Sequence, residues 1–223
     1  MNFSLIVPIA ADCENYKQQI PHVFQMAADG SFLCIKAIQG LDLSLFDQVY
    51  FTILKKLDEQ YSLKEMLQLQ FQIKGLKNAE VVVLDEPTSS QPETIYRTIC
   101  EKNITGSIFI KDADCSFNAE IVRQNSVAIY PLESMKWVNP QNKSYVAVDD
   151  MFYVTNIIEK KIVSHYFSAG GYCFESAEEF CEFYLRFGNR KGLYLSHIIY
   201  AMLLSKRFFR PIVISEYHDF DQE

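Results

Sequence analysis

The sequence predicts a single α/β domain whose mixed, mostly parallel central sheet is flanked by helices. In the first 110 residues, short apolar runs alternate with segments of helical spacing, which is the pattern of a parallel sheet with helices on both faces. From residue 125 the sequence becomes rich in strand-like stretches, and helical segments return near the end. The 223 residues are 49% hydrophobic, which is enough for one sizeable core.

The first half contains four predicted strands, and turn residues bound them. Helices are expected between the strands, each with a residue type that commonly starts or ends a helix, such as Gly40, Gly75 or Pro92. The predicted strands are 3–7, 48–54, 80–84 and 106–110, and the predicted helices are 33–40, 63–73 and 89–100.

In the second half, strands are expected at 126–130, 144–148, 152–158 and 210–215, and helices at 176–187 and 194–204. No internal repeat, low-complexity segment or linker separates the halves, so residues 1–223 are predicted to form one domain with halves at 1–124 and 125–223. The sequence predicts no particular oligomeric state.

Composition argues against several classes of function. The net charge is −7 and no cluster of Lys and Arg could neutralise a run of phosphates, so nucleic-acid binding is not expected. The six cysteines lie apart, without a C-x-x-C pair or a His at metal-ligand spacing, so a zinc site is not expected either. The first residues have no basic leader and too short an apolar run for a membrane span, which predicts a cytoplasmic protein with reduced thiols.

The sharpest local feature is Asp112-Ala113-Asp114, which follows the strand expected at 106–110. Ligands of open parallel sheets bind at the carboxyl ends of strands. Mg²⁺ prefers one or two carboxylates, with waters and substrate phosphate oxygens as its other ligands. The pair therefore predicts a Mg²⁺ site, although Asp112 alone could instead cap a turn.

Two further segments carry candidate residues. Glu159-Lys160-Lys161 follows a predicted strand, and Lys160 could neutralise a phosphate, while Gly170-Gly171 would let the backbone approach a ligand closely. The alternative is a solvated hairpin end with a glycine turn. His197 is expected to be buried and hydrogen-bonded in an apolar helix, whereas His218 could line a metal pocket beside Asp219.

Taken in order, these motifs resemble the nucleotidyltransferase family that makes nucleotide sugars and related activated phosphates, including choline-phosphate cytidylyltransferases. The resemblance spans essentially the whole chain. Asp112-Ala113-Asp114 resembles the metal-bearing aspartate motif, Glu159-Lys160 resembles Glu-Lys-Pro, Ala169-Gly170-Gly171-Tyr172 resembles Asn-Ala-Gly-Ile-Tyr, and Asp219-Phe220 resembles the closing Asp-Ile-Gly.

The resemblance implies a nucleotide-diphospho-sugar transferase-like fold, a nucleotide-binding first half and an acceptor-side second half. It also implies Mg²⁺ on Asp114 and Asp219, with Asp112 orienting a metal-bound water and Lys160 binding an acceptor phosphate. The implied nucleotide-binding residues are Pro8, Ile9, Ala10, Ser90 and Gln91, and the implied acceptor-binding residues are Glu159, Gly170 and Gly171. The implied partners are a nucleoside triphosphate or nucleotide-sugar and a small phosphorylated acceptor, in surface-polysaccharide synthesis.

The sequence departs from the family after the first strand. The family's Gly-x-Gly-Thr-Arg, which holds the triphosphate, is replaced by Ile9 to Lys17, and its Pro-Lys is Pro21-His22 here. Lys17 or Lys36 could supply the missing cation. Two alternatives stay open for this reason: a glycosyltransferase of the same fold that uses a nucleotide-sugar donor, and a non-catalytic nucleotide-binding relative.

Overall fold

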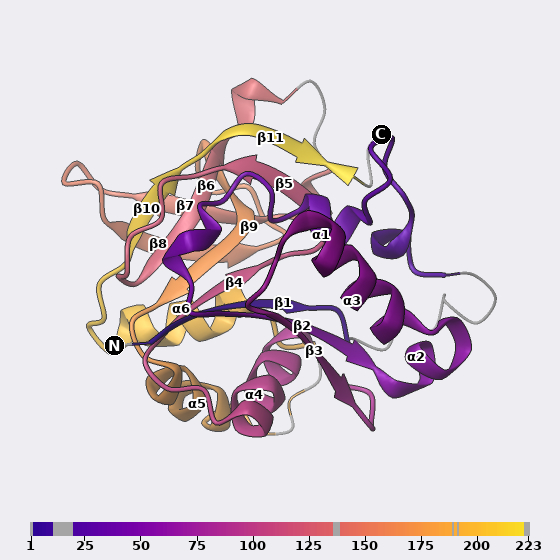
Figure 1. Cartoon of the computed structure of the whole chain (residues 1–223). Coiled ribbons are helices and arrows are strands. Elements are labelled where there is room, and N and C mark those ends of the chain that lie inside the picture. The colour runs from indigo at the N-terminus through magenta and orange to yellow at the C-terminus, as the bar shows by residue number, and fades with distance from the viewer. Residues whose placement is uncertain (1, 11–19, 136–138, 189, 191, 221–223) are drawn as a thin grey trace.

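The computed structural model describes residues 2–10, 20–135, 139–188, 190 and 192–220. Within them, Figure 1 shows a central sheet with helices on both sides. The strands are β1 (Phe3–Pro8), β2 (Gln48–Leu54), β3 (Ala79–Leu84), β4 (Ser107–Lys111), β5 (Cys115–Asn118), β6 (Ser126–Pro131), β7 (Ser144–Val148), β8 (Val154–Glu159), β9 (Tyr166–Phe174), β10 (Arg210–Val213) and β11 (Ser215–Asp219).

The helices lie mainly between the parallel strands and after β9. They are α1 (Leu33–Lys36), α2 (Lys55–Tyr61), α3 (Leu63–Lys74), α4 (Gln91–Lys102), α5 (Ala177–Leu185) and α6 (Leu195–Leu204), with short 3-10 helices η2 (His22–Phe24), η3 (Leu43–Leu45), η4 (Leu132–Ser134) and η5 (Pro140–Asn142). In Figure 1, α1 and α3 lie on one side of β1 and β2, and α4, α5 and α6 lie on the other.

In the described part of the chain the main sheet has nine strands, ordered β10-β6-β9-β4-β1-β2-β3, with β7 paired to β9 and β8 paired to β7. Strands β4, β1, β2 and β3 are parallel, whereas β9 is antiparallel to both β4 and β6. A separate two-stranded sheet joins β5 to β11. The predicted α/β class with a mixed, mostly parallel sheet is confirmed.

Strand β1 shows why the first half forms a parallel sheet. Five of its residues, 3–7, are buried, because helices cover both faces and leave no solvated side.

The predicted start of α4 is also confirmed. Ser90 Oγ accepts a hydrogen bond from Glu93 N, and Pro92 lies in the first turn. This cap fixes Ser90 and Gln91 at the carboxyl end of the sheet.

The alternative of a glycine turn at Gly170 and Gly171 was wrong. Both glycines lie within β9, a buried strand between β4 and β6. A Cβ on Gly171 would lie 2.7 Å from the Phe117 ring and 3.0 Å from Ala128 Cβ. The glycines therefore serve close packing within the strand. Strand β5 and helix α2 were not predicted.

No helix in the described part of the chain is both long enough and apolar enough to span a membrane.

Candidate functional site

The candidate site is built around the loop that follows β4. Residues Asp112 to Asp114 leave the sheet beside β9, and Asp112 N donates a hydrogen bond of 2.8 Å to Gly170 O. Gly170 has φ +79°, and a Cβ there would lie 2.7 Å from Asp112 Oδ2. Because Gly170 has no side chain, the Asp112 carboxylate can pack directly against the backbone of β9.

Asp112 is half-buried and hydrogen-bonded to the start of α4, where Gln91 Nε2 donates to its Oδ1. Burial and the neighbouring Asp114 carboxylate raise the pKa of Asp112 to about 6. A carboxyl with this pKa can exchange a proton near neutral pH. Asp114, by contrast, is exposed.

Beneath the loop lies Lys111, a fully buried lysine. Its Nζ donates to Asp112 O at 2.8 Å and to Cys115 O at 2.9 Å, and it lies 4.5 Å from the centre of the Phe117 ring. An ammonium in this position holds the two ends of the loop together. Its charge also opposes the effect of burial on Asp112 by lowering the pKa of that carboxyl.

Two adjoining cavities meet at this loop. Cavity A, of about 330 Å³, is lined among others by Asp112, Asp114, Glu159, Lys143, Lys160 and Gly170. Cavity B, of about 600 Å³, is lined among others by Pro8, Ile9, His22, Ser90, Gln91 and Asp114. Gln91, Asp112, Asp114 and Tyr194 line both, so the loop stands at their junction.

The structure divides most of the predicted residues between these cavities. Glu159, Lys160 and Gly170, expected on the acceptor side, line cavity A, while Pro8, Ile9 and Ser90, expected on the nucleotide side, line cavity B. Three predicted residues line neither cavity: Ala10 is fully buried, with its carbonyl accepting from Thr88 Oγ1, Gly171 packs in the sheet, and Asp219 accepts a hydrogen bond from the lining residue Lys143.

Glu159 and Lys160 are each held by neighbouring hydroxyl groups. Glu159 Oε2 accepts hydrogen bonds from Ser144 Oγ at 2.5 Å and from Ser196 Oγ at 2.8 Å. Lys160 Nζ donates to Tyr194 OH at 2.8 Å and lies over the Tyr194 ring. The carboxylate and the ammonium therefore enter cavity A from one wall, formed by the ends of β8 and α6.

Neither a comparison with protein-family models nor one with curated protein sequences finds a match. Solved structures do match. A nucleoside-diphosphate-sugar pyrophosphorylase from Vibrio cholerae matches with a TM-score of 0.77 and 16% identity, over 96% of this chain and 94% of that chain. The chain has the nucleotidyltransferase fold.

Two further structures agree with this nucleotidyltransferase fold. The inositol-1-phosphate CTP transferase from T. maritima matches with a TM-score of 0.74 and 13% identity, over 99% of this chain and 89% of that chain. A UDP-glucose pyrophosphorylase complexed with UDP-glucose matches with a TM-score of 0.72 and 11% identity, over 99% and 93%. The fold predicted from the sequence motifs is thus confirmed.

Within the nucleotidyltransferase fold, Asp219 lies next to the Asp112–Asp114 loop. It is paired with Cys115 in the small sheet, and Phe220 N donates to Asp114 O at 2.9 Å. Asp219 Oδ2 accepts a hydrogen bond of 2.7 Å from Lys143 Nζ, and the Asp219 side chain is only 9% exposed. Asp114 is therefore the more accessible carboxylate of the predicted metal pair.

The donor set suits Mg²⁺, which needs only one or two carboxylates because waters and phosphate oxygens complete its shell. Among the described residues no group of three or more His, Cys, Asp and Glu side chains gathers around one point. Such a cage is typical of metals held by protein alone, whereas a carboxylate pair fits an ion that arrives with a phosphate. Asp114 and Asp219 are the residues that could hold it.

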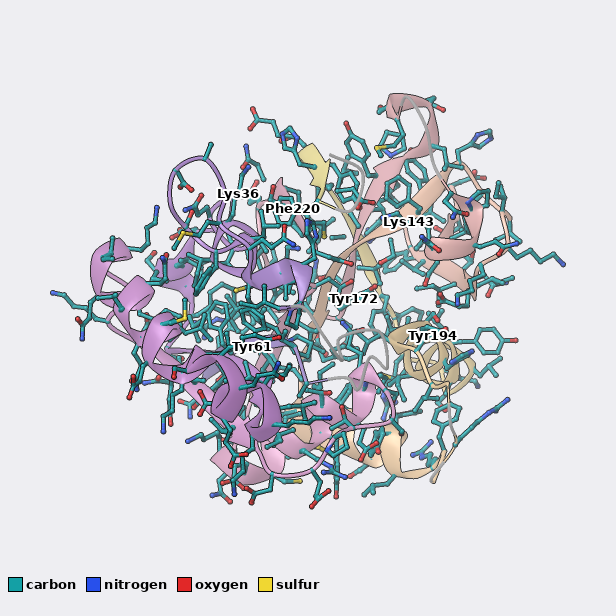
Figure 2. The ribbon with its side chains drawn as sticks, turned by 90° about the vertical axis from the view of Figure 1, so that its right-hand side faces the viewer. Lys36, Tyr61, Lys143, Tyr172, Tyr194 and Phe220 are labelled. Atoms are coloured by element: carbon teal, nitrogen blue, oxygen red, sulfur yellow. The ribbon has the colours of Figure 1, made fainter. Side chains whose placement is uncertain are left out.

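His218 and Lys36 lie elsewhere than the sequence suggested. Both line a separate small hollow on the far side of β11, where Lys36 Nζ lies 5.6 Å from the centre of the Phe220 ring. Successive residues of a strand face opposite sides, so Tyr217 faces cavity A while His218 faces away from it. Figure 2 shows Lys36 and Phe220 apart from Lys143 and Tyr194. Lys17 lies outside the described residues.

His197 has a structural role. Its Nδ1 accepts a hydrogen bond of 3.0 Å from Tyr194 N, which caps the start of α6, and burial lowers the pKa of His197.

Sequence reasoning missed two lysines of the site, Lys111 and Lys143. A lysine at a strand end or in a loop is usually solvated, so only the tertiary contacts mark these two.

Proposed function

We propose that this protein is a Mg²⁺-dependent nucleotidyltransferase that joins a nucleoside monophosphate from a nucleoside triphosphate to a sugar phosphate or another small phosphorylated acceptor. The single observation that carries the proposal is the Asp112–Asp114 loop at the junction of cavities A and B, on this fold. A carboxylate that reaches both cavities can act where two substrates meet. A role in surface-polysaccharide synthesis is proposed from the sequence resemblance alone.

In the proposed reaction, an oxygen of the acceptor phosphate attacks the α-phosphorus of the triphosphate. A new oxygen–phosphorus bond forms, the bond to the bridging oxygen breaks in line with it, and pyrophosphate leaves. Such a transfer needs positioning and charge neutralisation rather than a covalent intermediate. Cavity B is the larger and would take the nucleotide, and cavity A would take the acceptor.

Asp114, together with Asp219, would hold Mg²⁺, which supplies positive charge to phosphate oxygens when bound. A carboxylate offers about four acceptor sites, and the contact of Asp219 with Lys143 engages Oδ2. The ion pair is therefore compatible with coordination. Asp112, fixed by Gln91, would orient water at the metal, and Lys160 would bind the acceptor's phosphate.

The acceptor is proposed to carry hydroxyl groups. Glu159, fixed by Ser144 and Ser196, presents a carboxylate that can accept hydrogen bonds from such groups, and Ser168 lies in the same wall. Two of the structural neighbours are named for an inositol phosphate and a sugar nucleotide, both polyhydroxylated. Hydroxyl recognition by a fixed carboxylate agrees with an acceptor of this class.

The proposal is tested by incubating the protein with each nucleoside triphosphate, Mg²⁺, a set of sugar and polyol phosphates, and pyrophosphatase. Release of phosphate that depends on both substrates is the expected result. Asp114→Ala should abolish it, whereas Asp85→Ala, which changes an exposed aspartate paired with Lys55, should not. Absence of release with every triphosphate would refute the proposed reaction.

One observation favours a second candidate, a glycosyltransferase with a nucleotide-sugar donor. The described lining of cavity B includes no Lys or Arg, and the sequence lacks Gly-x-Gly-Thr-Arg, so the donor side has few cations for a triphosphate. Release of a nucleoside diphosphate from a nucleotide-sugar, without any reaction of triphosphates, would identify this activity.

The non-catalytic alternative is tested by thermal shift, because a ligand at about 100 times its Kd stabilises a protein by roughly 2.7 kcal/mol. A lack of thermal shift with every nucleotide would indicate the non-catalytic alternative.

A further inference from the structure

Lys143 is a charged side chain in cavity A that belongs to none of the sequence motifs. It precedes β7, and its Nζ donates hydrogen bonds of 2.7 Å to Asp219 Oδ2 and of 2.7 Å to Tyr217 OH. The Lys143 side chain is 14% exposed and that of Asp219 is 9% exposed. The ammonium is therefore fixed by its surroundings, unlike that of a typical surface lysine.

Stability alone does not account for this ion pair. Removing two charges from water costs several kcal/mol per ion, and buried pairs can often be replaced by apolar residues without loss of stability. The rings of Phe167 and Tyr217, whose centres lie 5.5 and 5.3 Å from Nζ, surround the ammonium with apolar surface. An ammonium has three donors. Asp219 and Tyr217 take two of them, which leaves a third for a ligand.

The charge of Lys143 acts toward the centre of the site. The Lys143 side chain lines cavity A together with Asp112. Cavity A is also lined by the carboxylates of Asp114 and Glu159. A phosphate entering between these carboxylates would be repelled unless a fixed cation offset their charge.

Ser168 gives a second, independent indication of a ligand. The residue is 6% exposed and lines cavity A. Within the described chain its Oγ makes no well-formed hydrogen bond, and the Tyr172 side chain is its polar neighbour. Buried hydroxyls are normally paired. The β7–β9 pairing of Tyr145 with Phe167 places Ser168 on the stretch of β9 that runs beside Lys143. Lys143 and Tyr172, both labelled in Figure 2, line cavity A.

We propose that Lys143 and Ser168 bind the phosphate group of the acceptor, with Asp219 and Tyr217 as the residues that position the ammonium. Lys143 supplies the charge-assisted hydrogen bond and Ser168 the neutral one. Lys160 lines the same cavity, and its backbone N donates a hydrogen bond of 2.9 Å to Lys143 O, so the two lysines are neighbours and both can contact the phosphate. The assignment of this phosphate to the acceptor rests on the proposed function.

The test measures the binding of inorganic phosphate to the full chain by phosphorus NMR, in the absence of nucleotide and metal. Lys143→Met, which keeps the side-chain length and removes the charge, should weaken phosphate binding roughly 10- to 150-fold. Lys143→Arg should retain part of the affinity. Lys77→Met, at an exposed position away from both cavities, is the matched control and should bind as the wild type does.

Ser168→Ala is the second variant and covers the case in which Lys143→Met fails to fold. Removing one neutral hydrogen bond should weaken phosphate binding roughly 2- to 10-fold. Wild-type affinity in both variants would overturn the proposal, and so would a wild type that gives no saturable shift with phosphate. Loss of affinity in both, with the control unchanged, would support it.

Kinetics separate this inference from the proposed reaction. If nucleotidyl transfer occurs and Lys143→Met leaves the acceptor's KM and kcat unchanged, the phosphate site is wrong while the reaction stands. If phosphate binding depends on Lys143 but no transfer occurs with any triphosphate, the reaction is wrong while the phosphate site stands.

Discussion

Gly170→Ala is expected to destabilise the protein by roughly 2 to 5 kcal/mol. Two costs add at this position. A left-handed backbone, here φ +79°, costs a non-glycine residue roughly 1 to 2 kcal/mol. The new Cβ would also lie 2.7 Å from Asp112 Oδ2 and 2.9 Å from Asp112 Cβ, and overpacking of this kind costs roughly 1 to 3 kcal/mol.

Two other glycines separate these costs. Gly75 has φ +71°, and no atom lies within 4 Å of a Cβ added there. Gly75→Ala should therefore show only the backbone cost, roughly 1 to 2 kcal/mol. Gly171 has no positive φ, but a Cβ added there would lie 2.7 Å from the Phe117 ring. Gly171→Ala should therefore show only the packing cost, roughly 1 to 3 kcal/mol.

Urea denaturation of the four proteins, with a common m-value, measures these differences. Gly170→Ala should be the least stable variant, and it should also lose transfer activity because Asp112 must move. If Gly170→Ala is no less stable than Gly75→Ala, the close approach of β9 to Asp112 does not restrict this position, and the reasoning is refuted.

Three further predictions concern the charged residues of the site. Lys160→Ala should lower kcat/KM for the acceptor roughly 10- to 150-fold while leaving nucleotide binding nearly unchanged, because it removes a charge-assisted contact to phosphate; wild-type kinetics would contradict the assignment. Lys111→Met should destabilise the fold by roughly 2 to 4 kcal/mol in urea denaturation, because the carbonyls of Asp112 and Cys115 lose a buried donor; a change below about 1 kcal/mol would exclude a structural role. The raised pKa of Asp112, about 6, favours the protonated form in the fold, so wild-type stability should fall as the pH rises from about 4 to about 6. Asp112→Asn should lack that fall and gain up to about 3 kcal/mol over the wild type between pH 4 and pH 7, whereas parallel pH profiles would show that the carboxyl titrates normally.

The sequence was sufficient for most of the architecture. The runs at 3–7, 48–54 and 80–84 are apolar at nearly every position, because parallel strands are buried on both faces, and that pattern can be read without a structure. The Asp112–Asp114 motif was also visible, since a polar pair directly after a buried strand falls at the carboxyl end of the sheet.

Strand β9 could not be predicted. Gly170 and Gly171 lower strand propensity, and the reason for them lies in residues distant in sequence: Asp112 and Phe117 occupy the space where their side chains would be. Only the tertiary structure brings these segments together, so the same two glycines read as a turn when the sequence is taken alone.

The charges of the site divide in the same way. Sequence alone indicated the carboxylates of the Asp112–Asp114 loop and the Glu159-Lys160 pair, because each group lies at the end of a strand. Lys111 and Lys143 depended on the tertiary structure, because a lysine's role is decided by what surrounds its ammonium. Carbonyl groups and an aromatic ring enclose Lys111, and Asp219, 76 residues away along the chain, holds Lys143. Contacts over such separations arise only when the chain folds.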